Sequence, residues 1–133
     1  MSIGFKIEST DGAARVAKVT THHGNYMTPA FMPVGTAATV KGMTPEALSR
    51  CGVQVLLANT YHLMLRPGVG RVARLGGVGK MMSWPGPVLT DSGGYQVMSL
   101  AKLRNLSEEG VDFQSHIDGD RYMLSPEKSV SLQ

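Results

Sequence analysis

Asp91 and its neighbours are the residues in this sequence whose types and spacing best suit chemistry. They form the segment Thr-Asp-Ser-Gly-Gly-Tyr-Gln at 90–96, directly after a short apolar run at 87–89 that favours a β-strand. Two glycines let the backbone turn tightly and lie close to a ligand. A carboxylate, an accessible backbone and an aromatic ring suit a planar heterocycle with adjacent N–H donors. Taken alone, Asp-Ser-Gly-Gly favours an ordinary turn over a functional site.

Alternating strands and helices are predicted to position this motif. Residues 30–34 and 87–89 favour short strands, and 53–58 is a nearly continuous apolar strand, as in a parallel sheet buried on both faces. A helix opens at Thr44, an N-cap residue followed by proline at the first helical position, and another spans 69–75. This alternation indicates parallel βαβ units with polar residues at the carboxyl ends of the strands.

Two β-hairpins are predicted outside these units. They pair 5–10 with 15–21 around Asp11-Gly12, and 111–116 with 121–124 around Asp118-Gly119. Ser125 then caps a final helix. The chain therefore divides into an N-terminal hairpin region, residues 1–28, and a region of opening βα units, residues 29–133, within a single domain.

Composition is that of an ordinary globular protein and narrows the function only slightly. Hydrophobic residues make up 42% of the chain, and the net charge of +3 comes from scattered basic residues, a weak indication of a nucleic-acid partner. No apolar run approaches the ~20 residues needed to cross a bilayer, so no membrane contact is expected. The single cysteine, Cys51, is expected to be buried and fits a reducing, cytoplasmic compartment.

A second glycine motif suggests a different function. Residues 68–73 fit the G-x-G-x-x-A pattern of dinucleotide-binding folds, with Asp91 as the acid that follows at ~20 residues. That fold requires a central strand before the glycines, but Pro67 adjoins the turn and makes such a strand unfavourable.

His62, which follows the strand predicted at 53–58, is interpreted as a hydrogen-bonded structural histidine that could also line a pocket.

Six segments, in this order and at this spacing, resemble the N-terminal part of the tRNA-guanine transglycosylases, also called queuine tRNA-ribosyltransferases. The segments are FMPVGT (31–36), NTYHL (59–63), LRPG (65–68), LTDSGGYQ (89–96), EEGV (108–111) and LSPEKS (124–129). The resemblance runs from about Phe5 to Gln133, and the family's chains are much longer, so an N-terminal portion is expected. It implies an α/β fold, the opening part of a modified (β/α)8 barrel with an inserted hairpin, incomplete within this chain.

The resemblance also implies a reaction. Family members exchange the wobble guanine of certain tRNA anticodons for a 7-deazaguanine, which is 7-aminomethyl-7-deazaguanine in bacteria and queuine in eukaryotes, through a covalent tRNA–enzyme intermediate. Asp91 matches the aspartate that contacts the base and serves as general acid/base. The other implied contacts are Ser92, Gly93 and Gly94 in the base pocket, Tyr95 stacked on the base, and Val34 and Leu57 at the ribose.

Several family features are expected beyond residue 133, namely the nucleophilic aspartate and a structural zinc held by three cysteines and a histidine. No cofactor or metal site is therefore expected in this chain, and alone it is expected to be inactive. The full-length protein is expected to bind tRNA and a guanine-type base and to form a homodimer. The alternatives are a non-catalytic RNA-binding or dimer partner of the same family, and a dinucleotide-binding module.

Overall fold

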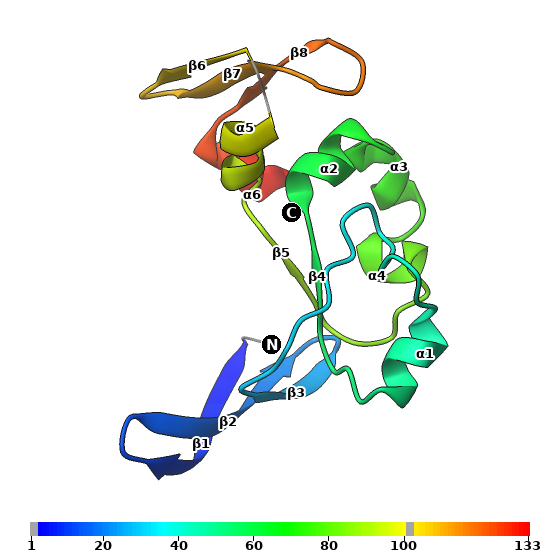
Figure 1. Ribbon diagram of the computed structural model, residues 1–133, viewed down its shortest axis with the longest axis vertical. Helices are drawn as coiled ribbons and strands as arrows, with labels where there is room; N and C mark the ends of the chain where they lie inside the picture. The colour runs from blue at the N-terminus through cyan, green and yellow to red at the C-terminus, as the bar shows by residue number, and fades with distance from the viewer. Residues whose placement is uncertain (1–2, 101–102) are drawn as a thin grey trace.

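A central pair of parallel strands organises the molecule. The computed structural model describes residues 3–100 and 103–133 (Figure 1). In it, β4 (Leu56–Ala58) and β5 (Val88–Thr90) pair in parallel, with Leu56 opposite Val88. One antiparallel sheet lies near the N-terminal end of this pair and a second lies beyond its carboxyl end (Figure 1). The carboxyl ends of β4 and β5 therefore point toward the second sheet.

The N-terminal sheet contains the predicted hairpin and one strand more. β1 (Gly4–Asp11) pairs with β2 (Ala14–Thr21) around Gly12, whose φ of +56° favours glycine. β3 (Gly24–Thr28) then pairs with the other edge of β2. We did not predict β3 because it begins with Gly-Asn, which is a turn signal. Its hydrogen-bond partners lie on the free edge of β2, which exists only after β1 and β2 have paired.

The predicted strand at 30–34 is reduced to a single parallel bridge between Val34 and Leu57. Around it, the Leu57 N–H donates to the Pro33 carbonyl and the Gly35 N–H donates to the Leu57 carbonyl, at 3.0 and 2.6 Å. Pro29 and Pro33 have no N–H to donate, which prevents a longer ladder. The predicted strand at 53–58 is likewise shorter, because only its last three residues form β4.

Of the six helices in the described part of the chain, three were predicted. They are α1 (Pro45–Arg50), α3 (Val69–Arg74) and α6 (Pro126–Leu132). In α1 and α6 the N-cap hydroxyls of Thr44 and Ser125 accept from main-chain N–H groups at 3.2 Å. The others are α2 (Thr60–Leu65), α4 (Val78–Met81) and α5 (Gly94–Leu100), which follow strands or glycines directly and were not predicted. Neither α2 nor α4 has a side-chain hydrogen bond at its N-cap.

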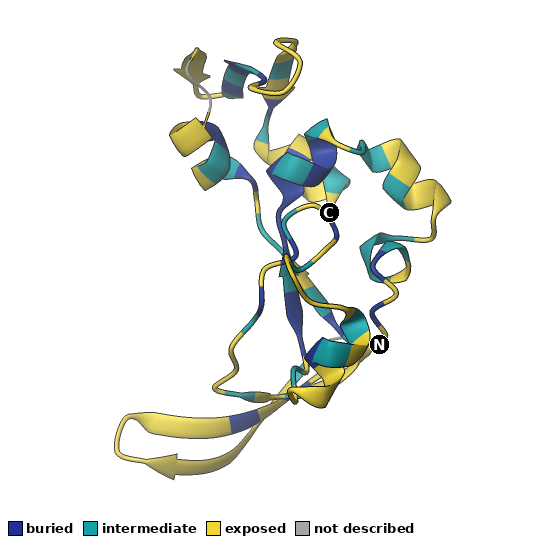
Figure 2. Ribbon diagram, turned by 45° about the vertical axis from the view of Figure 1, so that its right-hand side comes forward, coloured by how far each residue is buried: buried dark blue, intermediate teal, exposed yellow. Residues whose placement is uncertain are grey.

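Two hydrophobic clusters hold these elements together (Figure 2). The first packs Leu56 and Ala58 of β4 against residues such as Leu48 of α1 and Trp84. It covers one face of the parallel pair. The second cluster joins α2 and α5 to the second sheet, and its members are Tyr61, Met64, Val97, Val111, Phe113 and Leu124. The carboxyl ends of β4 and β5 are therefore fixed to the second sheet by packing.

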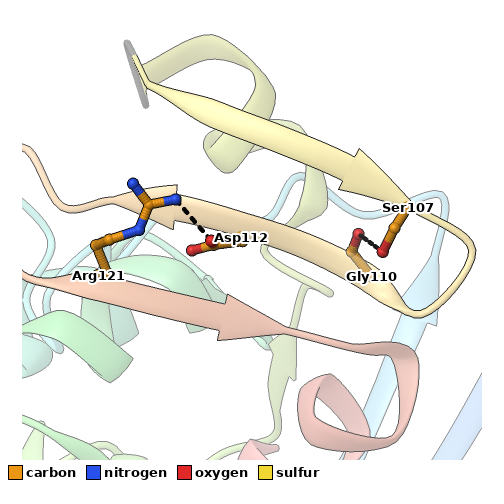
Figure 3. Close-up of polar contacts among 4 residues, drawn as sticks. All are labelled: Ser107, Gly110, Asp112 and Arg121. Atoms are coloured by element: carbon orange, nitrogen blue, oxygen red, sulfur yellow. Dashed lines mark hydrogen bonds and ion pairs between the residues drawn. The ribbon is translucent and has the colours of Figure 1, made fainter.

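The second sheet forms the predicted hairpin between β7 (Gly110–Gln114) and β8 (Arg121–Leu124), with β6 (Arg104–Ser107) added to the free edge of β7. Figure 3 shows the guanidinium of Arg121 bonded to Asp112 across the hairpin at 2.6 Å. Figure 3 also shows the Ser107 hydroxyl donating to the Gly110 carbonyl at 3.2 Å. A Cβ at Gly110 would lie 2.5 Å from the Leu124 carbonyl oxygen, so this position requires glycine.

The predicted barrel is seen only in its coarser features. The described residues contain parallel strands, covering helices and an inserted antiparallel sheet, without a closed barrel. Cys51 is exposed at the end of α1, so the prediction that it is buried is wrong. Within residues 3–100 and 103–133, no helix is both long and apolar enough to cross a membrane.

Candidate functional site

Asp91 lies just past the end of β5, beside Asn59, which occupies the equivalent place after β4. The Asn59 side-chain amide donates to Asp91 Oδ2 at 2.5 Å, and the Thr60 N–H donates to Oδ1 at 2.9 Å. The parallel pairing explains this contact, because the carboxyl ends of adjacent parallel strands meet at one edge of a sheet. The sequence placed Asp91 at this edge, and the structure adds Asn59 and Thr60 as its partners.

Two further donors reach the carboxylate from the following loop. The Gly93 N–H donates to Oδ1 at 3.2 Å, and the Gln96 side-chain amide donates to Oδ2 at 2.7 Å. Each carboxylate oxygen thus accepts two hydrogen bonds from described residues. Oδ1 is held by rigid main-chain groups, whereas Oδ2 is held by two side-chain amides that can rotate away. A ligand with adjacent N–H donors could replace those amides at Oδ2.

The glycines of the motif have different roles. Gly93 has a φ of +77°, and a Cβ there would lie 3.1 Å from the Tyr61 main-chain nitrogen, so glycine allows the loop to approach α2 closely. Gly94 instead begins α5, and a Cβ there would make only an ordinary contact with Ser92. The predicted tight turn therefore depends on Gly93. The Thr60 hydroxyl also donates to the main-chain carbonyl of Asp91.

A cluster of aromatic and histidine rings joins α2 to the segment that follows β7. The Tyr61 hydroxyl and His116 Nδ1 are 2.9 Å apart, and their rings stack with centroids at 5.7 Å. The His62 ring meets His116 edge-on at 6.1 Å. Burial lowers the pKa of His62, as does His116, while Asp91 acts in the opposite direction. The neutral imidazole is therefore favoured, as suits the structural role predicted for His62.

Tyr95 and Ser92 lie on the outside of this loop. The Tyr95 side chain is 81% exposed on the first turn of α5, and Ser92 is also exposed. Ser92, Gly93 and Gly94 form the loop that directly follows Asp91, and the Tyr95 ring after them is open to solvent. Stacking of that ring on a ligand stays a prediction.

Val34 and Leu57 form part of an apolar row across the sheet. Val34 bridges Leu57, and Leu57 lies opposite Leu89 of β5. The face of β4 that carries Leu56 and Ala58 packs under the helices, so Leu57 points to the opposite face. Val34 and Leu89 are each 48% exposed there. Leu89 was not predicted, although its position two residues before Asp91 places both on one face.

Sequence reasoning missed Asn59, Thr60 and Gln96 as partners of Asp91. Asn59 and Thr60 were recognisable as polar residues directly after a strand, the same signal that selected Asp91. The sequence gave no sign that Asn59 would follow the neighbouring strand in register with Asp91. Gln96 contacts Asp91 because α5 begins at Gly94, and that helix was not predicted.

The dinucleotide-binding alternative is wrong. Gly68 precedes α3, but the preceding element is the helix α2 instead of a strand. A glycine fingerprint without a strand before it cannot form the phosphate-binding turn of that fold. Among residues 3–100 and 103–133, no group of three or more His, Cys, Asp or Glu side chains could hold a metal ion.

The parallel strands, the helices beside them and the polar side chains at the carboxyl ends of the strands define an α/β protein. Sequence comparison identifies the family: the model of the queuine tRNA-ribosyltransferase family matches residues 10–133, so the chain belongs to that family. The queuine tRNA-ribosyltransferase of Granulibacter bethesdensis is 57% identical over 133 residues, which are 100% of this chain and 35% of that protein.

Other relatives with the same name show the same coverage. The Novosphingobium aromaticivorans protein is 60% identical over 129 residues, which are 97% of this chain and 34% of the relative. The Rickettsia felis protein is 58% identical over 129 residues, which are 97% of this chain and 36% of the relative. The chain thus spans about a third of the length of the curated relatives it matches.

Proposed function

We propose that this chain is the N-terminal part of a tRNA-guanine transglycosylase that exchanges the wobble guanine of a tRNA anticodon for a 7-deazaguanine. The observation that carries the proposal is the Asp91 carboxylate at the carboxyl ends of two parallel strands, held by Asn59, Thr60, Gly93 and Gln96. Family membership supports this assignment. The reaction proceeds through a covalent tRNA–enzyme intermediate, with a nucleophile from outside these 133 residues.

Asp91 contacts the base and moves a proton in this proposal. Guanine and 7-deazaguanine carry two neighbouring donors, N1–H and the exocyclic amine, which match the two amide donors now on Asp91 Oδ2. When the base enters, its donors replace those of Asn59 and Gln96, while Thr60 and Gly93 keep Oδ1 in place. In its protonated form the Asp91 carboxyl transfers its proton to the departing guanine, and the carboxylate that this leaves removes a proton from the incoming base.

The surroundings of Asp91 suit the rest of the nucleotide. Ser92, Gly93 and Gly94 line the base, and the exposed ring of Tyr95 stacks on it. The apolar row of Val34, Leu57 and Leu89 lies on the same face of the sheet as Asp91 and supports the ribose. Because the anticodon base is otherwise stacked, it must be turned out of its loop to reach this site.

The charge distribution favours an RNA partner more than the net charge suggests. No acidic residue occurs between Glu46 and Asp91, whereas this segment holds Arg50, Arg66, Arg71, Arg74 and Lys80. The last four of these are exposed on or beside α2, α3 and α4, and no described carboxylate pairs with them. α2 begins at the Asp91 site, so these cations can meet the phosphates next to a bound nucleotide.

The proposed whole protein is a modified (β/α)8 barrel in which β4 and β5 are early strands, residues 1–28 an N-terminal sheet region and 29–133 the opening βα units. The row of Val34, Leu57 and Leu89, of which Val34 and Leu89 are exposed in this chain, then faces the barrel interior, which explains its apolar character. The structural zinc of the family takes its ligands from elsewhere, since Cys51 is the only cysteine in this sequence. A cytoplasmic homodimer completes the proposal.

The test is guanine exchange into tRNA by two proteins. One is the 133-residue chain alone; the other is this chain joined to the remaining two-thirds of the Granulibacter bethesdensis relative. Radiolabelled guanine should enter tRNA only with the joined protein, and only that protein should bind zinc. Exchange by the chain alone would place a nucleophile within these 133 residues. A joined protein that binds tRNA without exchange would instead indicate a non-catalytic RNA-binding partner.

A further inference from the structure

A chain of hydrogen bonds from α6 holds the residues on both sides of Asp91. The Ser129 hydroxyl donates to the main-chain carbonyl of Ser92 at 2.8 Å. The Thr90 hydroxyl donates to the Gln133 side-chain carbonyl at 3.0 Å. Gln133 in turn donates its amide to the carbonyl and the hydroxyl of Ser129, at 3.1 and 3.4 Å. Thr90 and Ser92 flank Asp91, so α6 contacts the chain immediately before and immediately after it.

The arrangement on α6 suits this role. Ser129 lies within α6 and Gln133 is its C-cap residue four positions later, so both lie on one side of the end of the helix. Ser129 is only 7% exposed, and a buried hydroxyl is costly unless it is hydrogen-bonded. Its donor is used on Ser92 and its oxygen accepts from Gln133. Serine at this buried position thus makes two hydrogen bonds that an apolar side chain could not make.

The contacts from α6 complement those from α2. On the α2 side, Asn59 and Thr60 hold the Asp91 carboxylate, and the Thr60 hydroxyl holds the Asp91 carbonyl. On the α6 side, the contacts hold the side chain of Thr90 and the main-chain carbonyl of Ser92. The loop is thereby fixed from two directions. Such fixation matters for a proton-transferring group because a displacement of about 1 Å can reduce the rate ~10²-fold.

We propose that Ser129 and Gln133 are positioning residues for Asp91, which act through the main chain at 92 and the side chain at 90. This inference rests on the proposed function of Asp91 as the group that contacts the base and transfers the proton. It assigns α6 a part in the geometry of the reaction, although neither of its two residues touches the Asp91 carboxylate in the structure.

The first experiment measures guanine exchange in the joined protein described above. Ser129→Ala should lower kcat about tenfold, with KM for tRNA within about twofold, because positioning is lost and RNA contacts remain. Ser129→Thr should restore most of kcat, since it keeps the hydroxyl and its methyl group has room in the cavity of about 500 Å³ that Ser129 lines. Lys128→Ala, an exposed neighbour on the same helix, is the matched control.

The second experiment does not require activity. In the 133-residue chain, Ser129→Ala and Gln133→Leu should each speed amide hydrogen exchange in a peptide covering 90–97 about tenfold, and Lys128→Ala should not. A peptide covering 45–50 of α1 reports on general unfolding. Unchanged exchange at 90–97, or an equal increase at 45–50, overturns the proposal. If the loop responds as expected but the joined protein exchanges no guanine, it is the function proposed for Asp91 that fails.

Discussion

Asn59 donates its side-chain amide to the Asp91 carboxylate over 2.5 Å, from an equivalent place one residue past the neighbouring parallel strand. The contact is between residues 32 positions apart in the sequence. It joins the two strands at the edge where ligands bind in parallel α/β sheets. Because Asn59 is 8% exposed, its amide needs another acceptor whenever it releases Asp91.

Replacement of Asp91 by asparagine should nearly abolish base exchange. The variant keeps the shape of the side chain, but its NH2 group replaces one of the two acceptor oxygens that Asn59, Gln96 and the main chain now use. Its amide also cannot accept the proton. In the joined protein we expect a decrease in guanine incorporation of ~10²–10⁴-fold. Asp118→Asn is a suitable control, since either residue supports the turn contact with the Asp120 N–H. Turnover near that of the unmodified protein would exclude Asp91 from proton transfer.

Substitutions at Tyr95 should separate its ring from its hydroxyl. The ring is 81% exposed and free to stack on a base. We expect Tyr95→Ala to weaken base binding by ~1–3 kcal/mol, the usual range for stacking of a base on an aromatic ring, and Tyr95→Phe to have little effect. Competition by guanine in the exchange assay measures both. Comparable losses from Phe and Ala would assign the role to the hydroxyl instead.

Loss of the basic residues on α3 and α4 should weaken RNA binding through phosphate contacts. Replacing Arg71, Arg74 and Lys80 by glutamine should lower the affinity for an RNA hairpin and make the plot of log K against log salt less steep, by ~0.7 per lost contact to single-stranded RNA. The control removes the same charge from β1 and β2, by glutamine at Lys6, Arg15 and Lys18. Equal effects in both variants, measured by fluorescence anisotropy, would show that only net charge matters.

His62 should make stability depend on pH. Burial and His116 lower its pKa in the folded state, against the opposing effect of Asp91. The unfolded chain, with a histidine pKa of about 6.5, then takes up the proton first as the pH falls. The free energy of unfolding therefore keeps its full contribution from neutral His62 above about pH 6.5. That contribution decreases as the pH drops from there toward the folded-state pKa of His62.

Urea unfolding at several pH values tests this dependence. His62→Gln should make the free energy of unfolding change less between about pH 7.5 and 5.5, because the histidine that resists protonation is gone. A dependence that persists unaltered in His62→Gln would mean that other groups cause it.

The sequence predicted elements with strong local signals and missed those that depend on tertiary partners. The Thr44 and Ser125 caps and the Gly12 turn are determined by side chains next to them in sequence, and all three were predicted correctly. β3 and β6 were missed because each pairs along a strand edge that exists only after folding. Residues 30–34 were predicted as a strand because most of them are apolar. They form only one bridge, because the prolines at 29 and 33 have no N–H to donate.

The same division holds at the site. Asp91 was recognisable because its type, the strand before it and the glycines after it all occur within a few residues. Its contacts with Asn59 and Thr60 and the support from Ser129 span 31 to 37 residues and depend on the parallel register and on the place of α6. No spacing rule in a single sequence specifies such contacts.

The support of the Asp91 loop by α6 also has a consequence for biosynthesis. Asn59 and Thr60 precede Asp91 and are already synthesised when it leaves the ribosome, but Gln133 follows Thr90 by 43 residues. At a translation rate of ~5–20 residues per second, Gln133 is added roughly 2–9 s after Thr90. During that interval the nascent chain carries a half-formed site, open to proteases and to chaperones, which becomes rigid only when α6 arrives.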